Sequence, residues 1–167
     1  ERRLTYIYKT KPLLAVVEDL KIDSFSTKDF CVAWAANTKA PITSYSDDKE
    51  AAVIWGEAIT QVDSARINAT QLKDLWNQTN DKDITPFDGF HAAVTYHARA
   101  GLTVGADIFG LFPIYYWSQR DVILVGSSPE LFRYHPLFET KFNPAGLVGI
   151  LLTNGLFDGQ TLWQNVR

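Results

Sequence analysis

The stretch from Leu102 to Ser128 constrains the fold more than any other part of the chain. Three short apolar runs within it have strand character: residues 102–107, 114–117 and 122–125. Asp107 and Gly110 supply the acidic residue and the glycine that a sharp reversal needs, and residues 118–121 form a polar hairpin connection. The stretch therefore predicts an antiparallel meander of three strands.

The rest of the chain adds further short strands and two helices. Strand character is expected in residues 4–8, 13–17, 30–36, 50–57 and 90–98. Turn or loop chemistry is expected in residues 23–27 and 37–46. One helix is predicted to begin after Asn68, with Gln71 at the capping-box position, and its apolar face contains Leu72, Leu75 and Trp76.

A second helix is predicted after the N-cap pair Asn143-Pro144, with Leu147, Ile150 and Leu151 as its buried stripe and a stop at Asn154-Gly155. Many short strands with few helices favour, on pattern alone, an all-β sandwich with the helices packed outside it.

Composition and charge exclude several classes of function. The chain has 167 residues, of which 46% are hydrophobic and 21% charged, so one domain over residues 1–167 is expected. A net charge of -3 without a basic cluster argues against nucleic-acid binding, and no apolar stretch approaches the roughly 20 residues of a membrane-spanning helix. A single cysteine, Cys31, and the lack of a signal-like leader favour a cytoplasmic location.

Four motifs in a fixed order carry a family resemblance. The first reads Asp107-x-Phe109-Gly110-x-x-Pro113-x-Tyr115-Tyr116. The others are Gly126-Ser127-Ser128, Asn143-Pro144-Ala145-Gly146-Leu147 and Gly159-Gln160-Thr161-Leu162-Trp163-Gln164-Asn165-Val166-Arg167. This order resembles the N-terminal class II glutamine amidotransferase domain of the asparagine synthetase family. The resemblance implies an N-terminal-nucleophile fold, which is a four-layer αββα sandwich of two antiparallel sheets.

The resemblance also implies a catalytic residue that this chain lacks at the required place. Class II amidotransferases hydrolyse glutamine with a cysteine at the mature N-terminus, whose α-amino group relays the proton. Residue 1 here is Glu1, and Cys31 lies in an apolar strand-like run. Cys31 is therefore a weak catalytic candidate that would need cleavage after Phe30, and a small hydrophobic residue in a strand is the favoured interpretation.

Two binding elements of the family are also altered. The family builds its oxyanion hole with Asn-Gly in an N-G-E-I stretch, whereas this chain has Trp55-Gly56-Glu57. Gly56 and Glu57 are thus weak substrate-binding candidates, and the indole of Trp55 is expected to fill the pocket. No arginine occurs between Arg3 and Arg66 to hold the glutamine α-carboxylate, and Asp47 or Asp48 could occupy the region of the acidic partner.

The sequence therefore predicts a degenerate amidotransferase-like domain without glutaminase activity, belonging to an ATP-dependent amide-forming enzyme. Its partner would be a C-terminal synthetase domain after Arg167 that binds ATP and Mg; this domain itself is expected to hold no cofactor. His91, His97 and His135 lack a cysteine or carboxylate at ligand spacing, so no metal site is expected. Two alternatives stay open: an active amidotransferase domain that supplies ammonia for asparagine synthesis, and a non-catalytic interaction module or homodimer.

Overall fold

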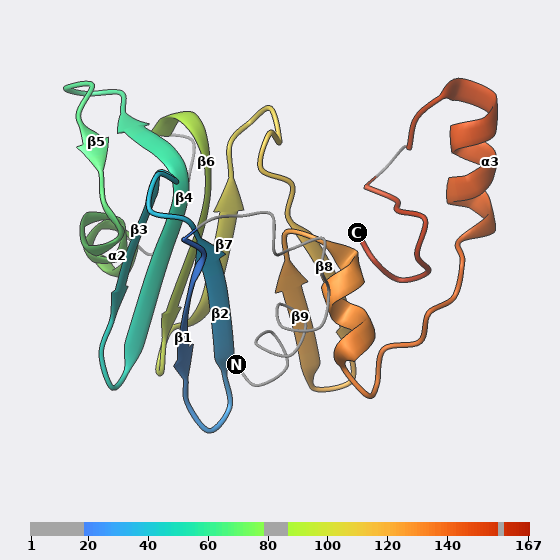
Figure 1. The fold of residues 1–167 in the computed structure, drawn as a ribbon, viewed down its shortest axis with the longest axis horizontal. Helices are drawn as coiled ribbons and strands as arrows, with labels where there is room; N and C mark the ends of the chain where they lie inside the picture. The colour runs from blue at the N-terminus through green and yellow to red at the C-terminus, as the bar shows by residue number, and fades with distance from the viewer. Residues whose placement is uncertain (1–18, 79–86, 157–158) are drawn as a thin grey trace. The chain divides into compact units, whose positions relative to one another are not determined.

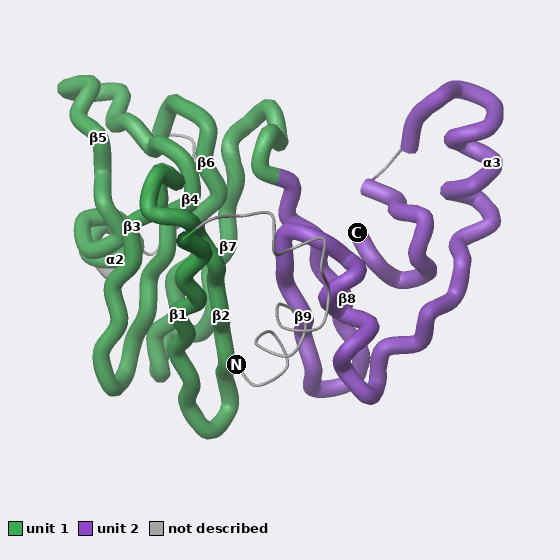
Figure 2. The backbone as a smooth tube through the Cα atoms, viewed as in Figure 1, with its two compact units in different colours: residues 1–112 green, residues 113–167 purple. Residues whose placement is uncertain are grey.

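The computed structural model describes residues 19–78, 87–156 and 159–167 (Figure 1). Within these residues the protein is of the α+β type, with mostly antiparallel strands and few helices. The chain forms two compact units, residues 1–112 and residues 113–167 (Figure 2). The strands expected at 4–8 and 13–17 lie outside the described residues. No helix in the described part has the length and apolar character needed to span a membrane.

The main sheet of unit 1 is built around two long strands that pair along their full length. These are β4 (Glu50–Thr60) and β6 (Phe87–His97). The sheet is completed at its edges by β3 (Ile42–Ser46), β7 (Gly101–Ala106) and the short β5 (Arg66–Ile67), which pairs with the end of β4. The strand expected at 50–57 is confirmed, but it continues through Gly56 to Thr60.

Alternating side chains of β4 bury both faces of this sheet. Ile54 and Ala58 point to the face covered by helix α2 (Ala69–Gln78), where Leu72 and Trp76 are buried. The opposite face is covered by the hairpin of β1 (Lys21–Ser26) and β2 (Cys31–Ala36). There Phe25 and Trp34 pack against Ala51 and Val53. Unit 1 is therefore a stack of helix, sheet and hairpin (Figure 1).

Local chemistry at the start of α2 agrees with the sequence. The backbone N–H of Gln71 donates to Asn68 Oδ1 at 3.0 Å, and the N–H of Asn68 donates to Gln71 Oε1 at 2.9 Å. The predicted capping box is confirmed. One turn later Lys73 reaches Glu50 of β4 at 2.7 Å and lies 4.5 Å from the centre of the Tyr45 ring, so the helix is also tied to the sheet by charge.

Two segments expected to be turns or loops are strands instead. Residues 23–27 fall largely in β1, and residues 42–46 of the expected loop form β3. Phe25 is the only residue of β1 that is fully buried, so the strand carries almost no apolar pattern. Its position is set by pairing with β2 and by the docking of the hairpin, where Phe30 stacks on Tyr96 with ring centres 4.0 Å apart.

The predicted three-strand meander is divided between two sheets. β7 ends the sheet of unit 1, whereas β8 (Tyr115–Gln119) pairs with β9 (Val122–Gly126) in unit 2. The reason is the long connection after Ala106, which winds around the side chain of Asp107 rather than forming a tight hairpin. The three strands themselves are confirmed; their pairing as one meander is wrong.

Unit 2 has a core of its own. Trp117, Phe132, Phe138 and Val166 are buried together, and Phe132 is contributed by the short 3₁₀ helix η2 (Pro129–Tyr134). The last segment of the chain closes this core, because Val166 pairs with Trp117 and Trp163 pairs with Phe142. Thr161 is buried and donates through Oγ1 to carbonyls of the same segment, which fixes its fold.

Helix α3 (Pro144–Thr153) begins and ends as expected but does not bury the expected stripe. Pro144 is at its first turn and Asn154 ends it with φ +60°. Leu147 and Leu151 are 46% and 74% exposed, so the predicted buried stripe is wrong. The helix is apolar all round, and such a pattern does not identify which side is covered.

Candidate functional site

The candidate site lies at Gly56 of β4, opposite His91, where the buried part of β6 begins. Gly56 has φ +85°, although it lies within a strand and pairs with His91. A Cβ at this position would collide with the carbonyl oxygen of Phe90 and would lie 2.9 Å from Cε2 of Phe112. Only glycine fits both the conformation and the space.

The backbone N–H of Gly56 is already engaged. It donates a hydrogen bond to the carbonyl oxygen of Pro41 at 2.7 Å. An oxyanion hole needs backbone donors that point at the position of the developing charge and are not used within the protein. In this structure the Gly56 amide holds the chain before β3 onto β4 instead.

His91 and Asp107 form a buried titratable pair beside Gly56. The backbone N–H of Asp107 donates to the carbonyl oxygen of His91 at 2.8 Å, which places the two residues opposite each other across neighbouring strands. Opposite residues of antiparallel strands have Cβ atoms about 5 Å apart. His91 is 2% exposed and Asp107 7%, and Nδ1 of His91 has no hydrogen-bond partner among the described residues.

The Asp107 carboxylate organises the turn that follows it. Its oxygens accept the backbone N–H groups of Phe109, Leu111 and Phe112, at 3.0 to 3.4 Å. The turn brings the ring of Phe112 against Gly56. Gly110 lies in the same turn with φ +63°, as its sequence position predicts. Asp107 and Gly110 therefore have a structural role, because both determine the backbone conformation of the turn.

The pKa values of both residues are lowered, but for different physical reasons. Burial lowers the pKa of the His91 imidazole below its ordinary value of 6.5, and the negative charge of Asp107 only partly opposes this. Burial is also the largest effect on Asp107 and would raise its pKa. The three backbone N–H donors, together with His91, outweigh burial and hold the pKa of Asp107 below its ordinary range.

The residues flanking Gly56 do not converge on this pair. Trp55 points to the opposite face of the sheet and packs in the core under the β1–β2 hairpin, beside Val53. Glu57 is exposed and forms an ion pair with Arg66 at 3.2 Å, between side chains that are 54% and 49% exposed. Neither residue offers a free group to a ligand at Gly56.

Cys31 lies in a different sheet from Gly56. It is the first residue of β2, it is exposed, and its Sγ accepts a hydrogen bond from Ser26 Oγ at 3.2 Å. The residue is a strand residue, as its apolar neighbours predict, but its side chain faces outward rather than into the core. Because Cys31 follows Phe30 in the chain, its nitrogen is part of a peptide bond and is not the free α-amino group that the family's nucleophile uses.

The sequence did not single out the His91–Asp107 pair. The sequence groups His91 with His97 and His135 and does not connect it to Asp107. That connection comes from the register of β6 and β7, which pairs Ala92 with Ala106 one step away. In the part of the chain that the structure describes, no group of three or more His, Cys, Asp or Glu side chains is placed to hold a metal ion.

Comparisons with protein-family models, with curated proteins and with solved structures found no match to the chain. The likeness to the asparagine synthetase family therefore depends on the ordered motifs of the chain itself.

Proposed function

We propose that the chain is a degenerate glutamine amidotransferase-like domain of an asparagine synthetase-related, ATP-dependent amide-forming enzyme, and that it has no glutaminase activity of its own. The observation that carries the proposal is the hydrogen bond from the Gly56 amide to the Pro41 carbonyl at 2.7 Å. It uses the donor that an oxyanion hole would need, at the position where the motif places that hole. The Trp55 side chain, which stands where the family has asparagine, is part of a core.

The architecture of unit 1 supports the fold named in this proposal. A helix on one face of the main sheet and a second antiparallel pair of strands on the other correspond to three consecutive layers of an αββα sandwich. The turn motif beginning at Asp107 supports it as well. Its acidic residue and its glycine have structural roles that any chain with this turn would need, whether or not it hydrolyses glutamine.

In this proposal the chemistry of the parent enzyme belongs to a synthetase domain that follows Arg167 and binds ATP and Mg. The segment 159–167 would lead into that domain. Val166 pairs with Trp117 of β8, which holds this segment in place. A domain that followed would therefore be attached to unit 2 at a fixed position. Reading the coding sequence beyond Arg167 tests this: an ATP-binding synthetase domain is expected, and a stop codon or an unrelated domain would remove the ligase part of the proposal.

A glutamine-like diazoketone tests the loss of the nucleophile. Such reagents alkylate the activated cysteine of a working amidotransferase site. Incubation of the protein with 6-diazo-5-oxo-L-norleucine, followed by intact-mass measurement, is expected to show an unmodified chain. A stoichiometric adduct that maps to Cys31 and is absent in Cys31→Ala would favour the alternative of an active, processed amidotransferase.

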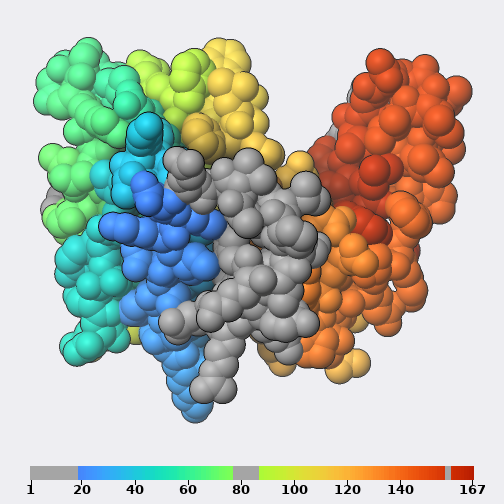
Figure 3. All heavy atoms as spheres, in the orientation of Figure 1, coloured from blue at the N-terminus to red at the C-terminus, as the bar shows by residue number. Residues whose placement is uncertain are grey.

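The apolar surface of α3 favours a second candidate, the non-catalytic interaction module. Leu147, Val148, Leu151 and Leu152 are each at least 46% exposed, and the atoms of this helix lie open on the face seen in Figure 3. Contiguous exposed apolar groups usually mark a contact surface. The expected partner is the synthetase domain or a second copy of the chain. Light scattering tests for the second copy. A dimer that becomes monomeric in Leu151→Glu would favour the interaction module.

A further inference from the structure

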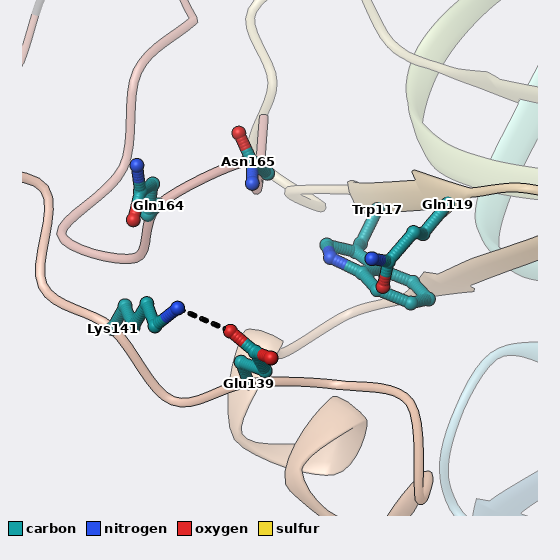
Figure 4. A pocket seen from close by; sticks show the side chains of 6 residues that line it. All are labelled: Trp117, Gln119, Glu139, Lys141, Gln164 and Asn165. Atoms are coloured by element: carbon teal, nitrogen blue, oxygen red, sulfur yellow. Dashed lines mark ion pairs between the residues drawn. The ribbon is translucent and has the colours of Figure 1, made fainter.

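A small polar hollow in unit 2 is independent of the Gly56 site and of the proposed function. Its volume is about 160 Å³, and it lies between strand β8, the segment 139–141 and the last residues of the chain (Figure 4). Six side chains surround it: Trp117, Gln119, Glu139, Lys141, Gln164 and Asn165. Drug-sized ligands occupy pockets of about 300 to 1,000 Å³, so only a smaller molecule fits here.

The walls of the hollow are held in place by backbone contacts. The N–H of Gln164 donates to the carbonyl oxygen of Lys141 at 2.8 Å, and Val166 pairs with Trp117. Trp117 is 3% exposed and makes an edge contact with Phe138, at 5.6 Å between ring centres. The backbone that carries the polar side chains is therefore held in one arrangement.

The lining groups select a ligand that carries both charges. Glu139 and Lys141 form an ion pair at one side of the hollow (Figure 4). The pair has no net charge. A simple anion would be attracted by Lys141 but repelled by Glu139, and a simple cation would experience the reverse. The side chains of Glu139 and Lys141 are 67% and 64% exposed, and an ion pair this exposed costs little to open.

Three carboxamides complete the lining, from the exposed residues Gln119, Gln164 and Asn165. Each offers one acceptor and two donors to a ligand. Asn165 has φ +63°, a left-handed conformation that asparagine adopts more readily than most residues. A sugar is disfavoured, because the buried Trp117 presents no open ring face for stacking.

We propose that this hollow binds a small free α-amino acid. Its carboxylate is held by Lys141, its ammonium group by Glu139, and the carboxamides of Gln119, Gln164 and Asn165 saturate the remaining donors and acceptors. Charge, size and hydrogen-bonding capacity all agree with this class of ligand. The site belongs to unit 2 alone, so it is present whether or not unit 1 hydrolyses glutamine.

The test is an NMR titration of the side-chain amide signals of the protein with glycine and L-serine, up to about ten times a dissociation constant of about 1 mM. Saturable shifts of the Gln119, Gln164 and Asn165 signals are expected. Acetate and methylammonium, which each carry one of the two charges, are expected to bind at least about tenfold more weakly.

Variants test whether glycine binding depends on the residues of the hollow. Lys141→Met and Gln164→Ala are each expected to weaken glycine binding by about tenfold or more, and Lys39→Met, an exposed lysine of unit 1, is expected to leave it unchanged. Two variants of different chemistry keep the test valid if one of them fails to fold. The proposal is wrong if glycine and L-serine shift none of these signals, if acetate binds as well as glycine, or if both folded hollow variants bind like the unmodified protein.

Discussion

Gly56 and Gly101 have almost the same backbone conformation in very different surroundings. Their φ angles are +85° and +83°, but a Cβ at Gly56 would collide with the Phe90 carbonyl and Phe112, while a Cβ at Gly101 would meet nothing within 4 Å. At the scale of single residues, the comparison separates the conformational need for glycine from the need for space. The candidate site is a place where both needs apply.

We therefore expect Gly56→Ala to be much more destabilising than Gly101→Ala. The left-handed conformation alone costs about 1 kcal/mol or slightly more for alanine, which is the whole effect expected at Gly101. At Gly56 the collision is added, and we expect a total above about 3 kcal/mol. Urea unfolding of the two variants measures the difference. Equal losses would mean that β4 yields easily at Gly56 and that the close packing of Phe112 has no energetic weight.

The buried imidazole of His91 makes stability depend on pH. Burial lowers its pKa below 6.5 in the folded protein, so the unfolded chain binds the proton more readily. The stabilisation by neutral His91 is then fully present above the ordinary pKa and is lost as the pH falls through 6.5 toward the folded value. Asp107, whose pKa is also lowered, adds a similar loss only below its ordinary value of 3.8.

His91→Leu is expected to flatten this dependence between about pH 7.5 and pH 5.5. Urea unfolding at the two pH values provides the measurement. The unmodified protein should lose stability on acidification, and the His91 variant should lose clearly less. An unchanged slope in His91→Leu would show that another group is responsible.

At the scale of elements, the sequence predicted those whose signal is local. The start of α2 was predictable because Asn68 and Gln71 cap the helix through their own side chains. β4 and β6 were predictable because both are buried and apolar. β1 and β3 were missed because pairing with a neighbour, rather than an apolar pattern, makes them strands. The side on which α3 is covered was not predictable from a helix that is apolar all round.

The capping box gives a prediction at this scale. Asn68→Ala removes the acceptor for the Gln71 N–H and is expected to destabilise the protein by about 1 kcal/mol. Thr70→Ala, an exposed change in the first turn of the same helix, should change stability by less than about 0.5 kcal/mol. Thermal unfolding of both variants is sufficient. If Thr70→Ala destabilised the protein as much as Asn68→Ala, the Asn68 cap would not explain why α2 begins where it does.

At the scale of the whole molecule, the sequence located the candidate site only through the family's catalytic and binding groups that are missing from it. The motifs located Gly56 and the Asp107 turn, and Trp55 at the asparagine position of the family's motif pointed to an altered oxyanion hole. What the sequence could not provide was the use of each group in three dimensions. The Gly56 amide donates to Pro41, Trp55 packs against the core under the β1–β2 hairpin, and His91 lies opposite Asp107 through strand register. Each of these contacts joins residues that are distant in the chain.

The release of glutamate from L-glutamine by the purified protein tests the central claim most directly, namely that unit 1 keeps the amidotransferase architecture without its chemistry. We expect no release above that of Cys31→Ala, measured in parallel at millimolar glutamine, because the thiol lies inside a strand and the Gly56 amide is already bonded. Catalytic release of glutamate that disappears in Cys31→Ala would contradict the account.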